Sequence, residues 1–170
     1  GKIGQLSLLF ERHHVHLFNF FLRLTSDRDM SEDLVQEVFL RMLKYRHTYR
    51  GESQFKTWMF RIARNARVDF ARKTQREDPI GEKDAARPDA SPIAIDRIEY
   101  GQNVEMLHQA LNKLPIDKRE VLVLSRFQNL KYHEIAELLD CSVGTIKLRV
   151  YRAIRELRTV FLQLTNEQAT

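Results

Sequence analysis

The chain has 170 residues, a net charge of +5 and a pI near 9.5, and 43% of its residues are apolar. Such values exclude a disordered or fibrous chain and favour a soluble, folded, basic protein of one ordinary domain or two small ones. The single cysteine, Cys141, excludes a disulfide framework and favours a reducing cytoplasm. No apolar run is long enough to cross a bilayer and no signal-peptide pattern opens the sequence, so we expect no membrane insertion.

The N-terminal part of the chain predicts two helices. The first covers about residues 3–24 and is rich in phenylalanine. After a turn at Thr25-Ser26-Asp27, the second helix is expected to begin at Ser31-Glu32-Asp33, where acidic groups suit the positive end of the helix dipole. Apolar residues at helical spacing predict its buried stripe: Leu34, Val35, Val38, Phe39, Met42 and Leu43.

The opposite face of this second helix is polar with one exception. Its residues are Asp33, Gln36, Glu37, Leu40 and Arg41. An exposed leucine among polar side chains indicates a docking surface for another macromolecule.

A basic and aromatic tract follows. Between residues 41 and 73 there are ten basic residues against two acidic ones, interleaved with aromatic rings that include Tyr45, Tyr49, Phe55, Trp58 and Phe60. A polar turn at residues 49–54 precedes a third helix, expected from Phe55 to about Lys73. Basic groups neutralise phosphates and aromatic faces stack unpaired bases, so the tract favours single-stranded or opened nucleic acid. Alternatively Phe55, Trp58, Ile62 and Ala66 are simply core, and for Trp58 burial and base contact both stay open.

Residues 74–95 break the helical pattern. They contain three of the four prolines, one glycine, and five acidic residues against three basic ones. This composition predicts a flexible acidic linker. The expected fold is therefore all-α: a helical domain at residues 1–73, the linker, and a second helical domain at residues 96–170.

The second domain contains a predicted helix-turn-helix. A short amphipathic helix starts near Tyr132 and ends at Asp140-Cys141, and Ser142 can cap the next helix. That longer helix has one apolar face: Ile146, Val150, Ala153, Ile154, Leu157 and Phe161. The outer face consists of Thr145, Leu148, Arg149, Arg152 and Arg155. Docking in the major groove of DNA requires such a basic face, whereas a merely solvated helix mixes its charges.

Other potential sites are weaker. His13, His14 and His16 lie close in sequence, but no acid or cysteine at ligand spacing completes a zinc site. Cys141, in the predicted turn, is interpreted as a packing residue rather than a redox switch. The sequence has no phosphate-binding glycine loop and no nucleophile-base set. We therefore expect no metal, no cofactor and no catalysis by this chain.

Three segments stand out in order along the chain: SEDLVQEVFLRMLKY, YRGESQFKTWMFRIARNARVDFARK and LPIDKREVLVLSRFQNLKYHEIAELLDCSVGTIKLRVYRAIRELR. They resemble the successive conserved regions of bacterial RNA polymerase sigma factors of the compact extracytoplasmic-function group. The resemblance covers nearly the whole chain. It implies a dissociable subunit that binds core RNA polymerase, recognises promoter DNA and directs transcription initiation of a specific regulon. It further implies docking on the β′ coiled coil and β flap, an acidic linker directed toward the RNA exit path, and restraint by an anti-sigma protein.

The resemblance also implies residue roles. The polymerase-docking residues are Asp33, Gln36, Glu37, Leu40 and Arg41. Contacts to the melted minus-ten element fall on Tyr49, Arg50, Gly51, Glu52, Ser53, Gln54, Trp58, Arg61, Arg64 and Asn65, with Asp69 on the same helix. Contacts to the duplex minus-thirty-five element fall on Gly144, Thr145, Lys147, Leu148, Arg149 and Arg152. Relatives often have a small polar residue in place of Leu148, whose apolar side chain suits a thymine methyl group.

Two other classes of protein remain as alternatives. A helix-turn-helix transcriptional regulator acting without core polymerase needs only the C-terminal half, and such proteins usually dimerise on palindromic sites. An RNA-binding or ribosome-associated helical protein would use both basic tracts without reading sequence.

Overall fold

The computed structural model describes residues 2–51, 54–77 and 101–168, and the chain divides into two compact units, Gly1–Asp89 and Ala90–Thr170. Within the described residues all regular structure is helical and none is strand, which confirms the predicted all-α fold class.

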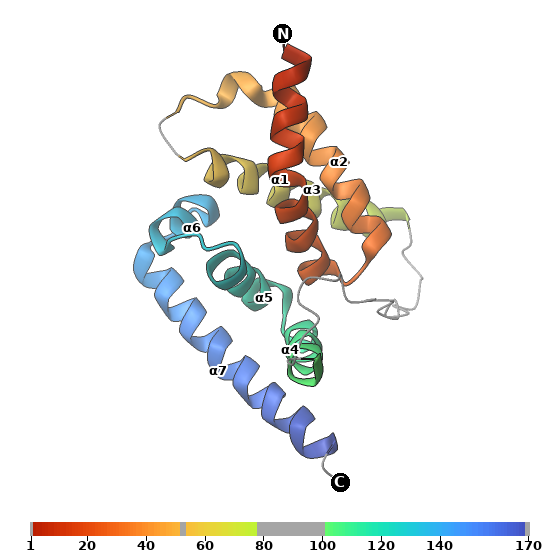
Figure 1. Cartoon of the computed structure of the whole chain (residues 1–170). Helices are drawn as coiled ribbons and strands as arrows, with labels where there is room; N and C mark the ends of the chain where they lie inside the picture. The colour runs from red at the N-terminus through yellow and green to blue at the C-terminus, as the bar shows by residue number, and fades with distance from the viewer. Residues whose placement is uncertain (1, 52–53, 78–100, 169–170) are drawn as a thin grey trace. The chain divides into compact units, whose positions relative to one another are not determined.

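The described part of the first unit is built from three long helices, whose arrangement Figure 1 shows. They are α1 (Lys2–Thr25), α2 (Arg28–Tyr45) and α3 (Phe55–Glu77), with a short 3-10 turn, η1 (Arg46–Thr48), after α2. Helix α2 packs against both α1 and α3. Their facing sides bury a phenylalanine-rich core that includes Phe20, Phe21 and Phe60, each fully buried, with edge-on contacts from Phe20 to the other two rings.

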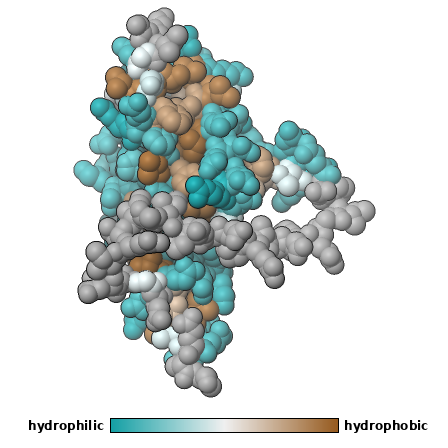
Figure 2. All heavy atoms as spheres, turned by 45° about the vertical axis from the view of Figure 1, so that its right-hand side comes forward, coloured by the Kyte–Doolittle hydropathy of each residue, from teal (hydrophilic) through white to brown (hydrophobic). Residues whose placement is uncertain are grey.

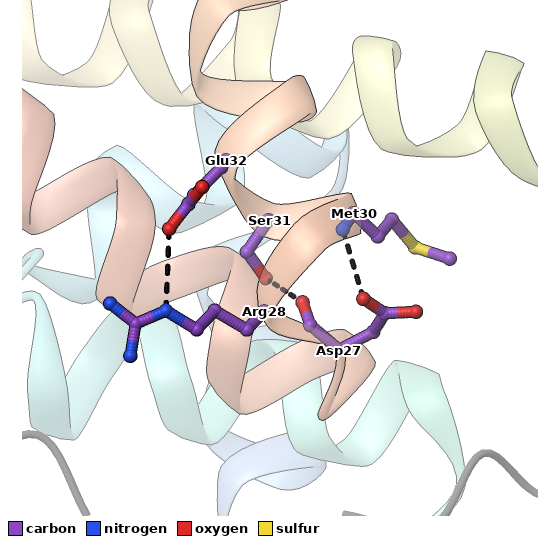
Figure 3. Close-up of polar contacts among 5 residues, drawn as sticks. All are labelled: Asp27, Arg28, Met30, Ser31 and Glu32. Atoms are coloured by element: carbon purple, nitrogen blue, oxygen red, sulfur yellow. Dashed lines mark hydrogen bonds and ion pairs between the residues drawn. The ribbon is translucent and has the colours of Figure 1, made fainter. Parts of the chain in front are cut away.

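Helix α2 begins three residues earlier than the sequence predicted. Asp27 is the capping residue, and its Oδ1 accepts a hydrogen bond of 2.9 Å from the backbone N–H of Met30 (Figure 3). Ser31, the predicted start, lies inside the helix, fully buried, and its hydroxyl donates to the backbone carbonyl of Asp27 at 2.5 Å. The aspartate before the predicted start is thus the group that satisfies the free amides of the first turn.

Helix α3 continues four residues beyond its predicted end. The linker prediction is therefore wrong for residues 74–77, where no proline or glycine interrupts the helix. Thr74 bonds back to the carbonyl of Phe70 at 3.1 Å, and Lys73 pairs with Glu77 one turn later. The rest of the predicted linker, residues 78–95, lies outside the described residues.

The second unit is assembled around the long helix α7 (Val143–Gln168). Three shorter helices pack against it: α4 (Gly101–Lys113), α5 (Ile116–Leu122) and α6 (Tyr132–Leu139). Helix α5 continues directly into a π-helical turn, η2 (Val123–Phe127). The core is aliphatic, with Val121, Leu124 and Ile135 all nearly inaccessible to solvent.

The turn between α6 and α7 confirms the predicted helix-turn-helix. Helix α6 ends at Leu139, and its capping residue Asp140 has a left-handed backbone with a φ of 53°. The N–H of Cys141 bonds back to the carbonyl of Ala136 at 3.0 Å. The Ser142 Oγ then accepts a hydrogen bond of 3.1 Å from the N–H of Thr145, as predicted for the cap of α7.

Two residues assigned to buried stripes are exposed instead. Leu43 of α2 is 39% exposed, because it lies about 110° from the middle of the stripe that faces α1 and α3. Ile154 of α7 is also 39% exposed. Residues Ile146, Val150 and Ala153 are buried as predicted, whereas Ile154 lies toward the edge of that face.

Candidate functional site

The outer side of α2 carries one strongly exposed apolar side chain among polar ones. Leu40 is 63% exposed, while Leu34 and Val38 on the opposite side of the helix are buried. Asp33 and Gln36 lie exposed on the same side as Leu40. The structure thus places three of the five predicted docking residues on one accessible surface.

Apolar surface also occurs on α1. Figure 2 shows apolar side chains near the N-terminal end of the chain, bordered by hydrophilic residues. In α1, Leu8 is 64% and Phe10 is 42% exposed, and the Phe10 ring packs on Phe39 of α2 at a centroid distance of 4.9 Å. Exposure of a leucine in this unit is therefore not unique to Leu40.

Arg41, the fifth predicted docking residue, turns toward α3. Its Nε donates to Glu37 at 2.6 Å, one turn earlier on α2, and its Nη1 donates to Asp69 of α3 at 2.7 Å. Partial burial alone would lower the pKa of Arg41, but the hydrogen bonds and negative charges of the two carboxylates outweigh it, and the net pKa is raised above its ordinary value. The guanidinium therefore joins two helices of the first unit.

An aromatic cluster covers the start of α3. The ring of Phe55 lies 5.7 Å from Tyr49 and 5.7 Å from Trp58, and the Tyr49 and Trp58 rings are 5.4 Å apart. The indole N–H of Trp58 donates to the hydroxyl of Thr48 at 3.2 Å. Tyr49 is 37% exposed and the other two rings are half-buried, so they combine packing with accessible ring surface.

His13 of α1 joins this cluster, which sequence reasoning had not placed there. Its ring lies 5.2 Å from that of Phe55. Burial lowers the pKa of His13 below its ordinary value of 6.5, and the nearby charges of His16, Arg12 and Lys56 lower it further. A contact between residues so far apart in the chain leaves no local signal in the sequence.

The remaining predicted minus-ten residues lie before and along α3. Arg50 and Gly51 are exposed, and Gly51 has a φ of 76°, a conformation that glycine adopts without strain. On α3 the side chain of Asn65 is exposed, and those of Arg61 and Arg64 are half-buried. Gln54 is exposed at the start of the helix, whereas Glu52 and Ser53 lie outside the described residues.

The outer face of α7 is accessible along the residues predicted to read DNA. Leu148 is 47% exposed, and Lys147, Arg149 and Arg152 are exposed with it. Thr145 is half-buried, and its hydroxyl lies 2.8 Å from the capping hydroxyl of Ser142. Part of the predicted reading surface therefore also forms the start of the helix.

Gly144, in the first turn of α7, has no steric reason within the molecule to be glycine. A Cβ added there would meet only the Oγ of Ser142, at 3.8 Å, an ordinary van der Waals contact. Its backbone does not have the left-handed conformation that glycine favours. The missing side chain leaves the helix backbone open to close approach by a ligand.

A capped helix-turn-helix whose second helix has a basic outer face is the architecture of major-groove DNA-binding proteins. The first unit adds a basic helix with accessible aromatic rings. Together these features are those of a helical DNA-binding protein.

Comparison with known families identifies both units. Residues 9–77 match the family model described as Sigma-70 region 2, and residues 104–157 match the one described as Sigma-70, region 4.

Curated relatives agree over nearly the whole length. The chain is 33% identical over 156 residues to the ECF RNA polymerase sigma factor SigX of Bacillus subtilis, covering 89% of this chain and 80% of SigX. It is also 33% identical over 165 residues to the ECF RNA polymerase sigma-E factor of Haemophilus influenzae, covering 90% of this chain and 85% of that protein. The chain belongs to the ECF RNA polymerase sigma factors and directs transcription initiation.

Solved structures match the same fold. One is the sigma factor RpoE in complex with the anti-sigma factor NepR from Bartonella quintana, with a TM-score of 0.74, 28% identity, and coverage of 92% of this chain and 96% of that one. CnrH, solved in complex with the cytosolic domain of CnrY, shares the fold with a TM-score of 0.67 and 22% identity, covering 91% of this chain and 86% of that one.

None of the helices in the described ranges combines the length and apolar character that spanning a bilayer requires.

Proposed function

We propose that the first unit docks on core RNA polymerase through Asp33, Gln36, Glu37 and Leu40, against the β′ coiled coil. The exposure of Leu40 supports this assignment, since an apolar side chain on a polar helix surface gains free energy when a partner covers it. Arg41 faces α3 instead, and the proposed surface leaves it out.

The first unit also binds the opened strand of the minus-ten element, at the start of α3. The segment 49–54 holds an unpaired base, and Trp58 with its neighbouring rings supplies stacking surface. Arg61, Arg64 and Asn65 contact the same strand along α3. The partial exposure of the aromatic rings next to this basic helix supports it.

In the second unit, α7 reads the duplex minus-thirty-five element and the rest of the unit binds the β flap. Leu148, Arg149 and Arg152 contact base edges, since they lie on the exposed face in the first turns of the helix. Lys147, whose ammonium is a compact point charge on an exposed side chain, contacts phosphate. Gly144 and Thr145 let the start of the helix approach the DNA closely.

The chain supplies promoter choice and catalyses no reaction itself, since polymerase makes the RNA. Two relatives of known structure are bound to other proteins, one of them an anti-sigma factor by name. We propose that an anti-sigma protein covers exposed surfaces of this chain in the same way.

The observation that carries the proposal is the presence, in one chain, of a capped basic reading helix and a separate basic-aromatic surface. The test is in vitro transcription with core polymerase over genomic fragments, followed by gel shifts with duplex, bubble and single-stranded promoter DNA, with and without core enzyme. We expect promoter-specific transcripts and core-dependent binding that prefers the bubble. Tight binding to a palindromic duplex without core enzyme, and no transcripts, would instead indicate an independent helix-turn-helix regulator.

A further inference from the structure

Arg41 follows Leu40 in the chain but not in space. Successive residues of a helix are rotated by about 100°, so the two side chains leave α2 in different directions. The Arg41 guanidinium crosses to α3 and bonds to Asp69 at 2.7 Å, while Glu37 holds its Nε at 2.6 Å. Its side chain is only 24% exposed, so it is engaged inside the first unit.

The bridge forms one wall of a recess beside the predicted DNA-contacting residue Asn65. The recess, of about 260 Å³, is lined by Arg41, Tyr45, Ile62, Asn65 and Asp69. Asp69 stands four residues after Asn65, hence one turn away on the same face of α3. An interaction that holds Asp69 against α2 therefore also holds the neighbouring turn of α3, on which Asn65 lies, in its rotation and position.

This ion pair differs from two other described pairs of the same unit. Arg28 and Glu32 pair within α2 at 3.3 Å with side chains that are 59% and 54% exposed (Figure 3), and Lys73 and Glu77 pair at 3.8 Å within α3. Such exposed pairs contribute little to stability. The Arg41 guanidinium instead binds two carboxylates with separate nitrogen atoms and connects two helices, a fixed geometry that a planar fork provides.

We infer that Arg41 is a positioning residue for promoter DNA: through Asp69 it holds α3 so that Asn65 faces the melted strand, and it does not contact polymerase. The inference rests on the proposed function, which assigns α3 to that strand. It gives Asp69 a role in DNA binding although its charge repels phosphate.

The negative charge of Asp69 distinguishes a direct effect of charge on DNA binding from positioning of Asn65. If Arg41 and Asp69 acted only through their own charges, Arg41→Met would weaken DNA binding and Asp69→Ala would strengthen it. If the pair positions Asn65, both single changes weaken DNA binding. The double variant should then bind DNA no less tightly than the worse of the two single variants, because either change removes the same bridge. Methionine keeps the apolar stem and the helix propensity of the arginine.

The measurement is the affinity of holoenzyme, assembled from the full chain and core polymerase, for a bubble promoter template and for the matching duplex. We expect about a threefold to tenfold loss on the bubble for each variant, and core polymerase affinity within about twofold of wild type. Arg28→Met is the matched control, because it removes an arginine-glutamate pair of α2 that does not reach α3. It should leave both affinities unchanged.

Three results would overturn the inference. One is stronger or unchanged bubble binding by Asp69→Ala. Another is loss of core polymerase affinity in Arg41→Met but not in Asp69→Ala, which would make Arg41 a docking residue. The last is additive loss in the double variant. If wild-type holoenzyme itself does not prefer the bubble to the duplex, the proposed function fails and not only this inference.

Discussion

Replacing Leu40 by aspartate tests the proposed polymerase-docking surface most directly. Complete burial of a leucine side chain contributes about 1.5–3 kcal/mol, and 63% of this side chain is available to a partner. Covering Leu40 therefore contributes about 1–2 kcal/mol to the binding free energy. Truncation to alanine should raise the dissociation constant for core polymerase by roughly 5- to 30-fold. Aspartate should weaken docking further, because a charge would be buried without a partner.

The same substitution should hardly affect folding. Leu40 points into solvent in the free protein, and exposed substitutions usually change stability by about 0.5 kcal/mol or less. The assay is binding of fluorescently labelled chain to core polymerase, with thermal unfolding measured in parallel. Leu8→Asp is the matched control, because Leu8 is 64% exposed on α1 of the same unit but lies outside the docking surface.

We expect Leu40→Asp to abolish measurable assembly at concentrations where Leu8→Asp still binds like wild type, with both melting temperatures close to wild type. Normal assembly of Leu40→Asp would refute the assignment of the surface. A large loss of melting temperature would show that Leu40 belongs to the core, contrary to its exposure.

Three further predictions concern the reading helix, a titrating group and a helix cap. Arg152→Ala should reduce discrimination between single-base variants of the minus-thirty-five element by about 1–3 kcal/mol. Lys147→Ala should instead weaken binding to all variants alike and make the salt dependence of binding shallower. A uniform loss of affinity for Arg152→Ala would contradict a base contact. The pKa of His13 in the folded chain lies below its ordinary value of 6.5, so on acidification the imidazole is protonated in the unfolded chain first. The free energy of unfolding should therefore fall as the pH drops below about 6.5 and level off below the folded-state pKa. His13→Gln should flatten this slope in urea unfolding at pH 7.5 and 5.5, and an unchanged slope would exclude His13 as its source. Asp27→Ala removes the cap of α2 and should cost about 1 kcal/mol, seen as a melting temperature lower by about 4–8 °C, while an unchanged value would mean that water replaces the cap.

The helical pattern of this chain was readable from sequence wherever local chemistry decides it. The spacing of Ile146, Val150 and Ala153 predicted the buried face of α7, and Ser142 predicted its cap, because both depend on residues within two turns of one helix. The ordered motifs likewise indicated the family, which the relatives confirm. The sequence predicted two helix ends wrongly. Helix α2 begins earlier because Asp27 caps it, and α3 continues further because no helix breaker precedes residue 78.

Contacts between helices could not be read in this way. The sequence placed Arg41 on the surface of Leu40, yet the Asp69 carboxylate of another helix draws its guanidinium inward. It gave no reason to associate His13 with Phe55, whose rings meet only when α1 and α3 pack together. Periodicity reports which side of a helix is apolar, whereas the partner of a charged or aromatic side chain depends on packing between segments far apart in the chain, so these pairings were decided by the tertiary structure alone.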